Sequence, residues 1–94
     1  MEAKMDSILD SMMQRDHVTG VLIADNQGLS CGTRGSAHSH ASGLITALSQ
    51  QAAKIHPNLD APVVILESEN TSVTISKYGP HTGAIYKKKS PLKK

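Results

Sequence analysis

Three glycines lie close together in the first half of the chain and could form a loop that binds phosphate. Gly28, Gly32 and Gly35 follow the spacing G-x-x-x-G-x-x-G. A dinucleotide-binding loop has the spacing G-x-G-x-x-G, and a P-loop ends in Gly-Lys followed by Ser or Thr. Neither pattern occurs in the sequence. We therefore interpret these glycines as turn and strand residues, and we expect no bound nucleotide or other cofactor.

Metal binding by histidines is the second chemistry to consider. His38 and His40 form a pair, and His17, His56 or His81 would have to supply a third ligand. Residues two apart in a helix do not share a face, and no Cys or Glu flanks the pair at the spacing of a zinc site. We interpret the pair as part of a polar loop before a helix, and we predict no metal site.

Nucleophilic catalysis is the third. It needs a serine or cysteine beside a base, and a carboxylate that orients the base. We find no such arrangement around the serines and histidines, so we predict no catalytic residue and no enzymatic activity. The only cysteine, Cys31, falls on the inward side of a predicted strand, where we expect a small buried hydrophobe. A lone cysteine also leaves no partner for an internal disulfide and fits a reducing compartment such as the cytosol.

The composition is that of one small folded domain. The chain has 94 residues, of which 38% are hydrophobic and 19% charged, so it is neither a disordered acidic chain nor a coiled coil. Phe and Trp are absent, and the core must be built from Val, Ile, Leu, Met and Ala. A chain of this length buries roughly 60–70% of its unfolded surface. Without a disulfide or metal it can depend on a partner for stability.

Charge is divided between the body of the chain and its end. Ten basic and eight acidic residues give a net charge of +2, but five of the lysines lie within residues 87–94. Without these lysines the body has five basic and eight acidic residues, a charge of −3. Such a body lacks the basic face of a nucleic-acid-binding module. We expect a folded domain over residues 1–86 and a basic, disordered tail over 87–94 whose contact with anionic lipid is weak at most.

Membrane attachment by the chain itself is not predicted. No apolar run approaches the ~20 residues that span a bilayer, and the N-terminal residues lack the apolar core of a signal peptide. The sequence also offers no acceptor for a myristoyl or prenyl group near its ends. We expect a cytoplasmic protein that meets a membrane only through its partners.

Hydrophobic periodicity predicts two helices and five strands. The helices are expected at 2–16 and from Ser36 or Ser39 to Ile55, and the strands at 18–24, 29–34, 62–67, 72–78 and 82–86. The run 18–24 is apolar on both faces, as is typical of a central strand, and a turn follows it. The order α-β-β-α-β-β-β predicts an α+β fold with a mostly antiparallel five-stranded sheet.

The second helix has two stripes of side chains. The larger stripe is expected to pack on the sheet and comprises Ala41, Leu44, Ile45, Leu48, Ala52 and Ile55. The other stripe is small at one end and polar at the other, and comprises Gly43, Ala47, Gln50 and Lys54. This second stripe either lets another helix approach closely or simply faces solvent.

Several short segments occur in the order and spacing of a known family. They are Gly20-Val21-Leu22, residues 25–29, Arg34-Gly35, residues 50–54 and residues 62–68. With them, the chain from about residue 2 to 87 resembles the hepatitis B virus X-interacting protein family, the fifth subunit of the Ragulator complex. That family belongs to the roadblock/dynein light-chain superfamily.

The resemblance implies a roadblock/LC7-like fold and a scaffolding role. Roadblock domains pair through the second helix and third strand into one continuous sheet. Ragulator recruits Rag GTPases to late endosomes and lysosomes and supports amino-acid-dependent activation of mTORC1. The implied partners are another roadblock subunit, the fourth Ragulator subunit, and a lipidated subunit that wraps both. The chain could also form a homodimer when isolated.

The implied interface combines the second helix stripe with the third strand. Its expected residues are Gly43, Ala47, Gln50, Lys54, Val63, Val64, Ile65 and Leu66. The apolar strand would be an edge strand, which suits the proline at its start, and Val64→Lys should lower partner binding more than folding. We expect the C-terminal third helix usual in the superfamily to be absent, which would leave part of one sheet face for another protein.

Two other functions remain open at this point. The chain could be a roadblock-type light chain or adaptor of dynein or of another small-GTPase system, although the absent third helix and the Gln50–Lys54 segment argue against this. It could also be a small hydrolase or nucleotide-binding domain, which a thermal-shift screen with nucleotides would detect.

Overall fold

The computed structural model describes residues 2–55, 57–58 and 62–89. The helices are α1 (Glu2–Met13) and α2 (Ser42–Ile55), the latter preceded by one 3-10 turn at Ser39–Ala41. The strands are β1 (Val18–Ala24), β2 (Ser30–Gly35), β3 (Val64–Glu67), β4 (Thr71–Tyr78) and β5 (His81–Lys88). All strand pairs are antiparallel, in the order β2-β1-β5-β4-β3. The predicted α+β fold and element order are confirmed.

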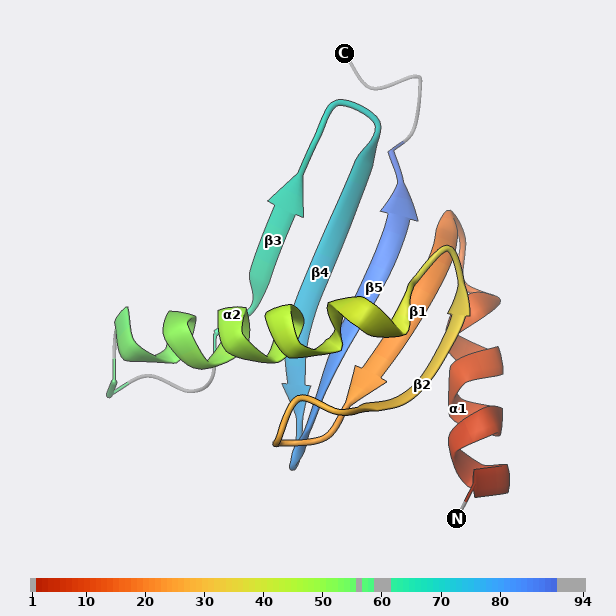
Figure 1. The fold of residues 1–94 in the computed structure, drawn as a ribbon. Helices are drawn as coiled ribbons and strands as arrows, with labels where there is room; N and C mark the ends of the chain where they lie inside the picture. The colour runs from red at the N-terminus through yellow and green to blue at the C-terminus, as the bar shows by residue number, and fades with distance from the viewer. Residues whose placement is uncertain (1, 56, 59–61, 90–94) are drawn as a thin grey trace.

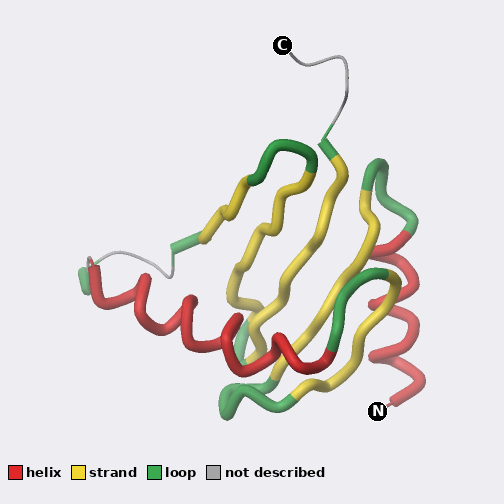
Figure 2. Tube along the Cα trace, turned by 45° about the horizontal axis from the view of Figure 1, so that its top comes forward, coloured by secondary structure: helices red, strands yellow, loops and turns green. Residues whose placement is uncertain are grey.

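The sheet lies between the two helices (Figure 1). Alternation along β1 decides which residue meets which helix: Leu22 and Ala24 join the core under α2, and Val21 and Ile23 join the core under α1. All four side chains are buried, so the prediction that β1 is a central strand is confirmed. Two separate cores therefore hold the helices on opposite faces, as the turned view also shows (Figure 2).

Local turn chemistry closes the first hairpin. The Asp25 carboxylate accepts hydrogen bonds from the backbone N–H groups of Gln27 and Leu29, both at 2.9 Å. Gly28 has φ +88°, a conformation that favours glycine. Gly35 ends β2 with φ +65°. A Cβ at this position would clash with the carbonyl oxygen of Thr19. The predicted roles of these glycines in turns and strands are confirmed.

Element ends differ from the predictions by a few residues. α1 ends at Met13, and His17 reverses the chain with φ 69°. β3 begins at Val64, and β5 runs through Lys88. The predicted loop at 56–62 lies largely outside the described residues, as do residues 90–94 of the tail predicted over 87–94. Lys87 and Lys88 belong to β5, so the expectation that the tail is disordered from residue 87 is wrong for these two residues. No third helix follows β5 in the part of the chain described, which ends at Lys89.

The structure corrects the prediction for Cys31. Its side chain is exposed, so the expectation of a buried hydrophobe is wrong. β2 is an edge strand, and its neighbour Gly32 is the residue that packs against α1, where an added Cβ would lie 2.6 Å from Leu9 Cδ1. The register between β1 and β2 shifts here: Gly32 pairs with Ile23 and Ser30 with Ala24, so Cys31 lies at the irregularity with no partner residue on β1.

Candidate protein interface

The largest exposed apolar side chains of α2 form a stripe along one side of the helix. Leu44 is 72% exposed, Leu48 39% and Ile55 83%. Their spacing of four and seven residues places them on one face. The prediction that these three pack on the chain's own sheet is therefore wrong. We call Leu44, Leu48 and Ile55 the α2 stripe.

The face of α2 that does pack on the sheet is built from smaller side chains. Its buried residues are Ser42, Ile45, Thr46 and Ser49. Small side chains let the helix lie close to a sheet whose own Leu22 and Ile75 fill the space between the layers. The Ser42 hydroxyl donates to the Gly28 carbonyl at 2.8 Å and fixes the start of α2 on the hairpin.

The sequence-predicted stripe of α2 lies beside the α2 stripe. Gly43, Ala47, Gln50 and Lys54 are all exposed. An added Cβ at Gly43 would meet no atom within 4 Å, so its own fold does not require glycine there. Both the small-residue stripe and the apolar stripe are thus available on the outer side of the helix.

β3 is the second part of the candidate interface. Within the described part of the chain it pairs with β4 alone, which confirms the prediction that it is an edge strand. Val63, Ile65 and Leu66 are 55%, 58% and 46% exposed. Val64 is half-buried because it packs against the core under α2. An apolar edge strand with an unpaired backbone is a template for another strand.

The two parts lie close together. α2 contacts β3 across one face of the sheet. In Figure 1 the C-terminal end of α2 extends past the edge formed by β3. The overhanging helix end carries Ile55, so an added strand at β3 would lie beneath or beside an exposed apolar helix surface.

A groove lies on the opposite face, beside α1. It has a volume of about 480 Å³. α1 contacts β1 and β2, and within the described residues no helix covers the same face of β4 and β3. The groove is lined by Lys4, Met5, Ile8, Met12, Arg15, Ile23, Tyr78 and His81.

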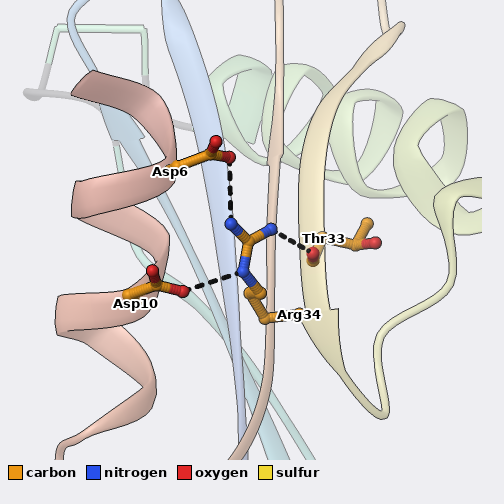
Figure 3. Close-up of polar contacts among 4 residues, drawn as sticks. All are labelled: Asp6, Asp10, Thr33 and Arg34. Atoms are coloured by element: carbon orange, nitrogen blue, oxygen red, sulfur yellow. Dashed lines mark hydrogen bonds and ion pairs between the residues drawn. The ribbon is translucent and has the colours of Figure 1, made fainter. Parts of the chain in front are cut away.

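α1 is tied to β2 by an ion-pair network that sequence reasoning missed (Figure 3). Arg34 on β2 donates from Nη2 to Asp6 and from Nε to Asp10, both at 2.9 Å, and from Nη1 to the Thr33 carbonyl at 2.9 Å. The two carboxylates raise the pKa of Arg34. The spacing of the two aspartates, four residues apart on one helix face, is the signal that could have indicated a common partner.

Among the described residues, which do not include His56, those considered for chemistry do not assemble into a site. His38 and His40 are exposed, and over residues 2–55, 57–58 and 62–89 no three His, Cys, Asp or Glu side chains come together in a metal-binding group. Partial desolvation raises the pKa of the Cys31 thiol, and the Asp25 charge raises it further. A thiol with a raised pKa is a poorer nucleophile at neutral pH because less of it is ionised.

A serine motif was also overlooked in the sequence. Gly28-Leu29-Ser30-Cys31-Gly32 fits the pattern G-x-S-x-G of a nucleophile elbow. An elbow lies between a strand and a helix, which raises the serine to the top of the sheet. Here the segment joins a turn to an antiparallel edge strand, and Ser30 is an exposed strand residue. The segment therefore matches the sequence pattern of a nucleophile elbow but does not have its structure.

Among the residues described, no helix is both long and apolar enough to cross a membrane.

Comparison with known proteins identifies the family. Residues 1–87 match the family described as Ragulator complex protein LAMTOR5. The protein of that description from Xenopus tropicalis is 42% identical over 88 residues, covering 93% of this chain and 97% of the relative. The homolog from Nematostella vectensis is 33% identical over the same shares of both chains.

Solved structures give the fold independently. A roadblock/LC7 domain from Streptomyces avermitilis superposes with a TM-score of 0.75 at 20% identity, over 88% of this chain and 77% of that one. Myxococcus xanthus MglB superposes with a TM-score of 0.80 at 14% identity, over 93% and 71%. The chain has the roadblock/LC7 fold and belongs to the Ragulator complex protein LAMTOR5 family.

Proposed function

We propose that this protein is a non-catalytic scaffold subunit of a Ragulator-like complex, and that it acts by pairing with another roadblock subunit through α2 and β3. The observation that carries the proposal is that α2, which bears the exposed α2 stripe, contacts β3, whose apolar outer edge pairs with no other strand of the described chain. Either feature alone would be costly to expose to water, and both would be covered by one partner of the same fold.

Pairing would use two kinds of contact. A strand added at β3 would satisfy the outward N–H and C=O groups of the edge, as in β-augmentation. A helix of the partner would cover Leu44, Leu48 and Ile55 and bury apolar area at roughly 25 cal/mol per Å². The backbone contact would fix the orientation of the two domains, and the helix contact would supply most of the hydrophobic gain.

The fourth Ragulator subunit is the partner we propose, because the relatives that cover nearly the whole chain carry the Ragulator name. In this role the protein would help to recruit Rag GTPases at late endosomes and lysosomes for amino-acid-dependent activation of mTORC1. Homodimerisation through the same surface is the alternative for the isolated chain. A dynein light-chain role is the runner-up, and it has no support beyond the shared fold.

The groove beside α1 would receive a second partner, the lipidated wrapping subunit. Met5, Ile8 and Met12 give it an apolar floor, and Lys4 and Arg15 give it basic positions. An apolar segment with acidic flanking residues would fit both features. Membrane association would then be indirect.

Co-expression with the fourth Ragulator subunit tests the pairing. We expect a 1:1 complex by size-exclusion chromatography with light scattering. Ile65→Lys should abolish the complex, because a lysine on an edge strand discourages strand addition. Asn26→Lys, at an exposed turn outside the interface, is the matched control and should leave it intact. A wild-type chain that elutes apart from the partner would refute the proposal.

A further inference from the structure

The groove beside α1 lies between that helix and the end of the β4–β5 hairpin. Tyr78 ends β4 and is 50% exposed. Its ring lies against Gly83 of β5, where an added Cβ would be 2.7 Å from Tyr78 Cε2. Ile23, the partner of Gly83 on β1, also lines the groove. Because Gly83 has no side chain, an aromatic ring can lie against the sheet at the side of the groove opposite α1.

Charge along α1 is sorted between its two sides. Lys4 and Arg15 both line the groove. Asp6 and Asp10 are turned toward β2, where both accept hydrogen bonds from Arg34. No Asp or Glu is among the described residues that line the groove. The groove therefore combines an apolar surface with positive charge, and it suits a ligand that is both apolar and anionic.

The size and lining of the groove fit a small molecule with a flexible apolar chain. Its volume of about 480 Å³ lies within the roughly 300–1,000 Å³ of small-molecule sites. Met5 and Met12 are unbranched and adapt to the shape of a ligand. An extended peptide would bring an N–H and a C=O at every residue, and each would need a partner if buried. An alkyl chain brings no such groups.

We propose that the groove binds a single-chain anionic amphiphile, an alkyl chain that ends in a carboxylate or a phosphate. The chain would lie on Met5, Ile8 and Met12. In Figure 1 the N-terminal end of α1 and the β4–β5 turn lie at the same end of the sheet. Lys4 in the first turn of α1 and His81 after the β4–β5 turn both line the groove, so the anionic head would lie at this end.

This ligand goes beyond the function proposed above and does not depend on pairing through α2 and β3. The groove is the one we propose for the wrapping subunit. One groove cannot hold both, so a bound amphiphile would compete with that subunit.

Isothermal titration of the isolated full chain with fatty acids below their micelle-forming concentrations tests the site. From octanoate to decanoate to dodecanoate, each step should tighten the Kd by about tenfold, because a buried methylene contributes up to about fourfold. Dodecyltrimethylammonium has the same tail and a cationic head, and it should bind at least about tenfold more weakly than dodecanoate. Dodecyl phosphate gives the other head: whichever of the two anions binds more tightly identifies a fatty acid or an alkyl phosphate as the ligand.

Matched substitutions locate the bound chain. Ile8 in the groove and Leu48 on the α2 stripe are similarly exposed, at 41% and 39%. Ile8→Asp should weaken dodecanoate binding by at least about tenfold, and Leu48→Asp by less than about twofold. Circular dichroism checks that both variants are folded. Lys4→Gln should weaken binding by about threefold, and Lys77→Gln, outside the groove lining, should leave it unchanged.

Three results would overturn the proposal. The first is no binding of dodecanoate to the wild-type chain. The second is equal binding of the cationic and anionic amphiphiles, which would mean that the positive charge of the groove selects nothing. The third is a loss with Leu48→Asp as large as the loss with Ile8→Asp, which would place the alkyl chain on the α2 stripe.

Discussion

Arg34 on β2 and Asp6 on α1 are joined by an ion pair in which Nη2 lies 2.9 Å from Oδ1. Asp10, one turn later on α1, accepts from Nε of the same guanidinium. One arginine thus holds two turns of the helix against the edge of the sheet. Because all three side chains reach solvent, the attraction is screened by salt.

Arg34→Ala should lower the thermal unfolding temperature at low salt, and the difference from wild type should shrink as salt is added. Arg15→Ala is the matched control, because Arg15 is an exposed arginine outside the ion pairs of the described residues. Thermal melts at several salt concentrations check this. A destabilisation that is independent of salt would show that Arg34 acts through packing and not charge.

The two stripes of α2 make opposite predictions about pairing. If the α2 stripe is the contact, Leu48→Lys should weaken partner binding by at least about 2 kcal/mol, or roughly 30-fold, as for a central apolar contact. Gln50→Lys, in the stripe that the sequence favoured, should change affinity by less than about threefold. Isothermal titration with the fourth Ragulator subunit measures both. The reverse order of effects would restore the small-residue stripe as the interface.

The sequence-based reasoning failed on α2 for a physical reason. Hydrophobic periodicity shows that a helix has an apolar face, but not whether its own sheet or another chain covers that face. Here Leu44 and Ile55 lie outside, while Ser42 and Thr46 lie inside. Polar residues at a helix–sheet contact are usually interpreted as solvent-facing, which is why the true inner face was missed.

All five strands were predicted, and the burial of their side chains was clearest where a strand has neighbours on both sides. β1 lies between β2 and β5, so its apolar pattern was decisive. β2 has one neighbour, and its register with β1 shifts between Ile23 and Ala24. Because of this shift, counting alternate residues from the preceding turn did not predict which way the Cys31 side chain points. Side-chain partners far apart in sequence, such as Arg34 and Asp10, depend on the folded arrangement and left only a weak local signal.

Val64→Lys is a poorer test of the edge than the sequence suggested. Val64 packs against the core under α2, whereas Ile65 is 58% exposed on the other face. Val64→Lys should therefore destabilise the isolated chain by about 1–3 kcal/mol, and Ile65→Lys by less than about 0.5 kcal/mol. Urea unfolding of the two variants checks the ranking. Equal losses of stability would mean that both side chains lie in the core.

Cys31 should ionise only above the ordinary range of a thiol. Desolvation and the Asp25 charge both disfavour the thiolate, so the folded pKa is raised above the unfolded one. The small stability contributed by this shift is present below the unfolded pKa and is lost as pH rises through the folded pKa. The rate of alkylation by iodoacetamide should rise at a higher pH than for a free cysteine. Asp25→Asn keeps an acceptor oxygen in the turn and should move this profile toward lower pH.

A substitution at Gly43 can distinguish an effect on folding from an effect on partner binding. It lies in the first turn of α2, with open space where a Cβ would be. Gly43→Ala should therefore stabilise the isolated chain by roughly 0.5–1 kcal/mol, because alanine is the better helix former. Gly35→Ala is the contrasting variant: its φ of +65° and the nearby Thr19 carbonyl should make it destabilising. Urea unfolding measures both. If Gly43→Ala stabilises the chain yet weakens binding to the fourth Ragulator subunit, a partner helix approaches at this position; if it stabilises the chain and leaves binding unchanged, the contact lies on the neighbouring α2 stripe.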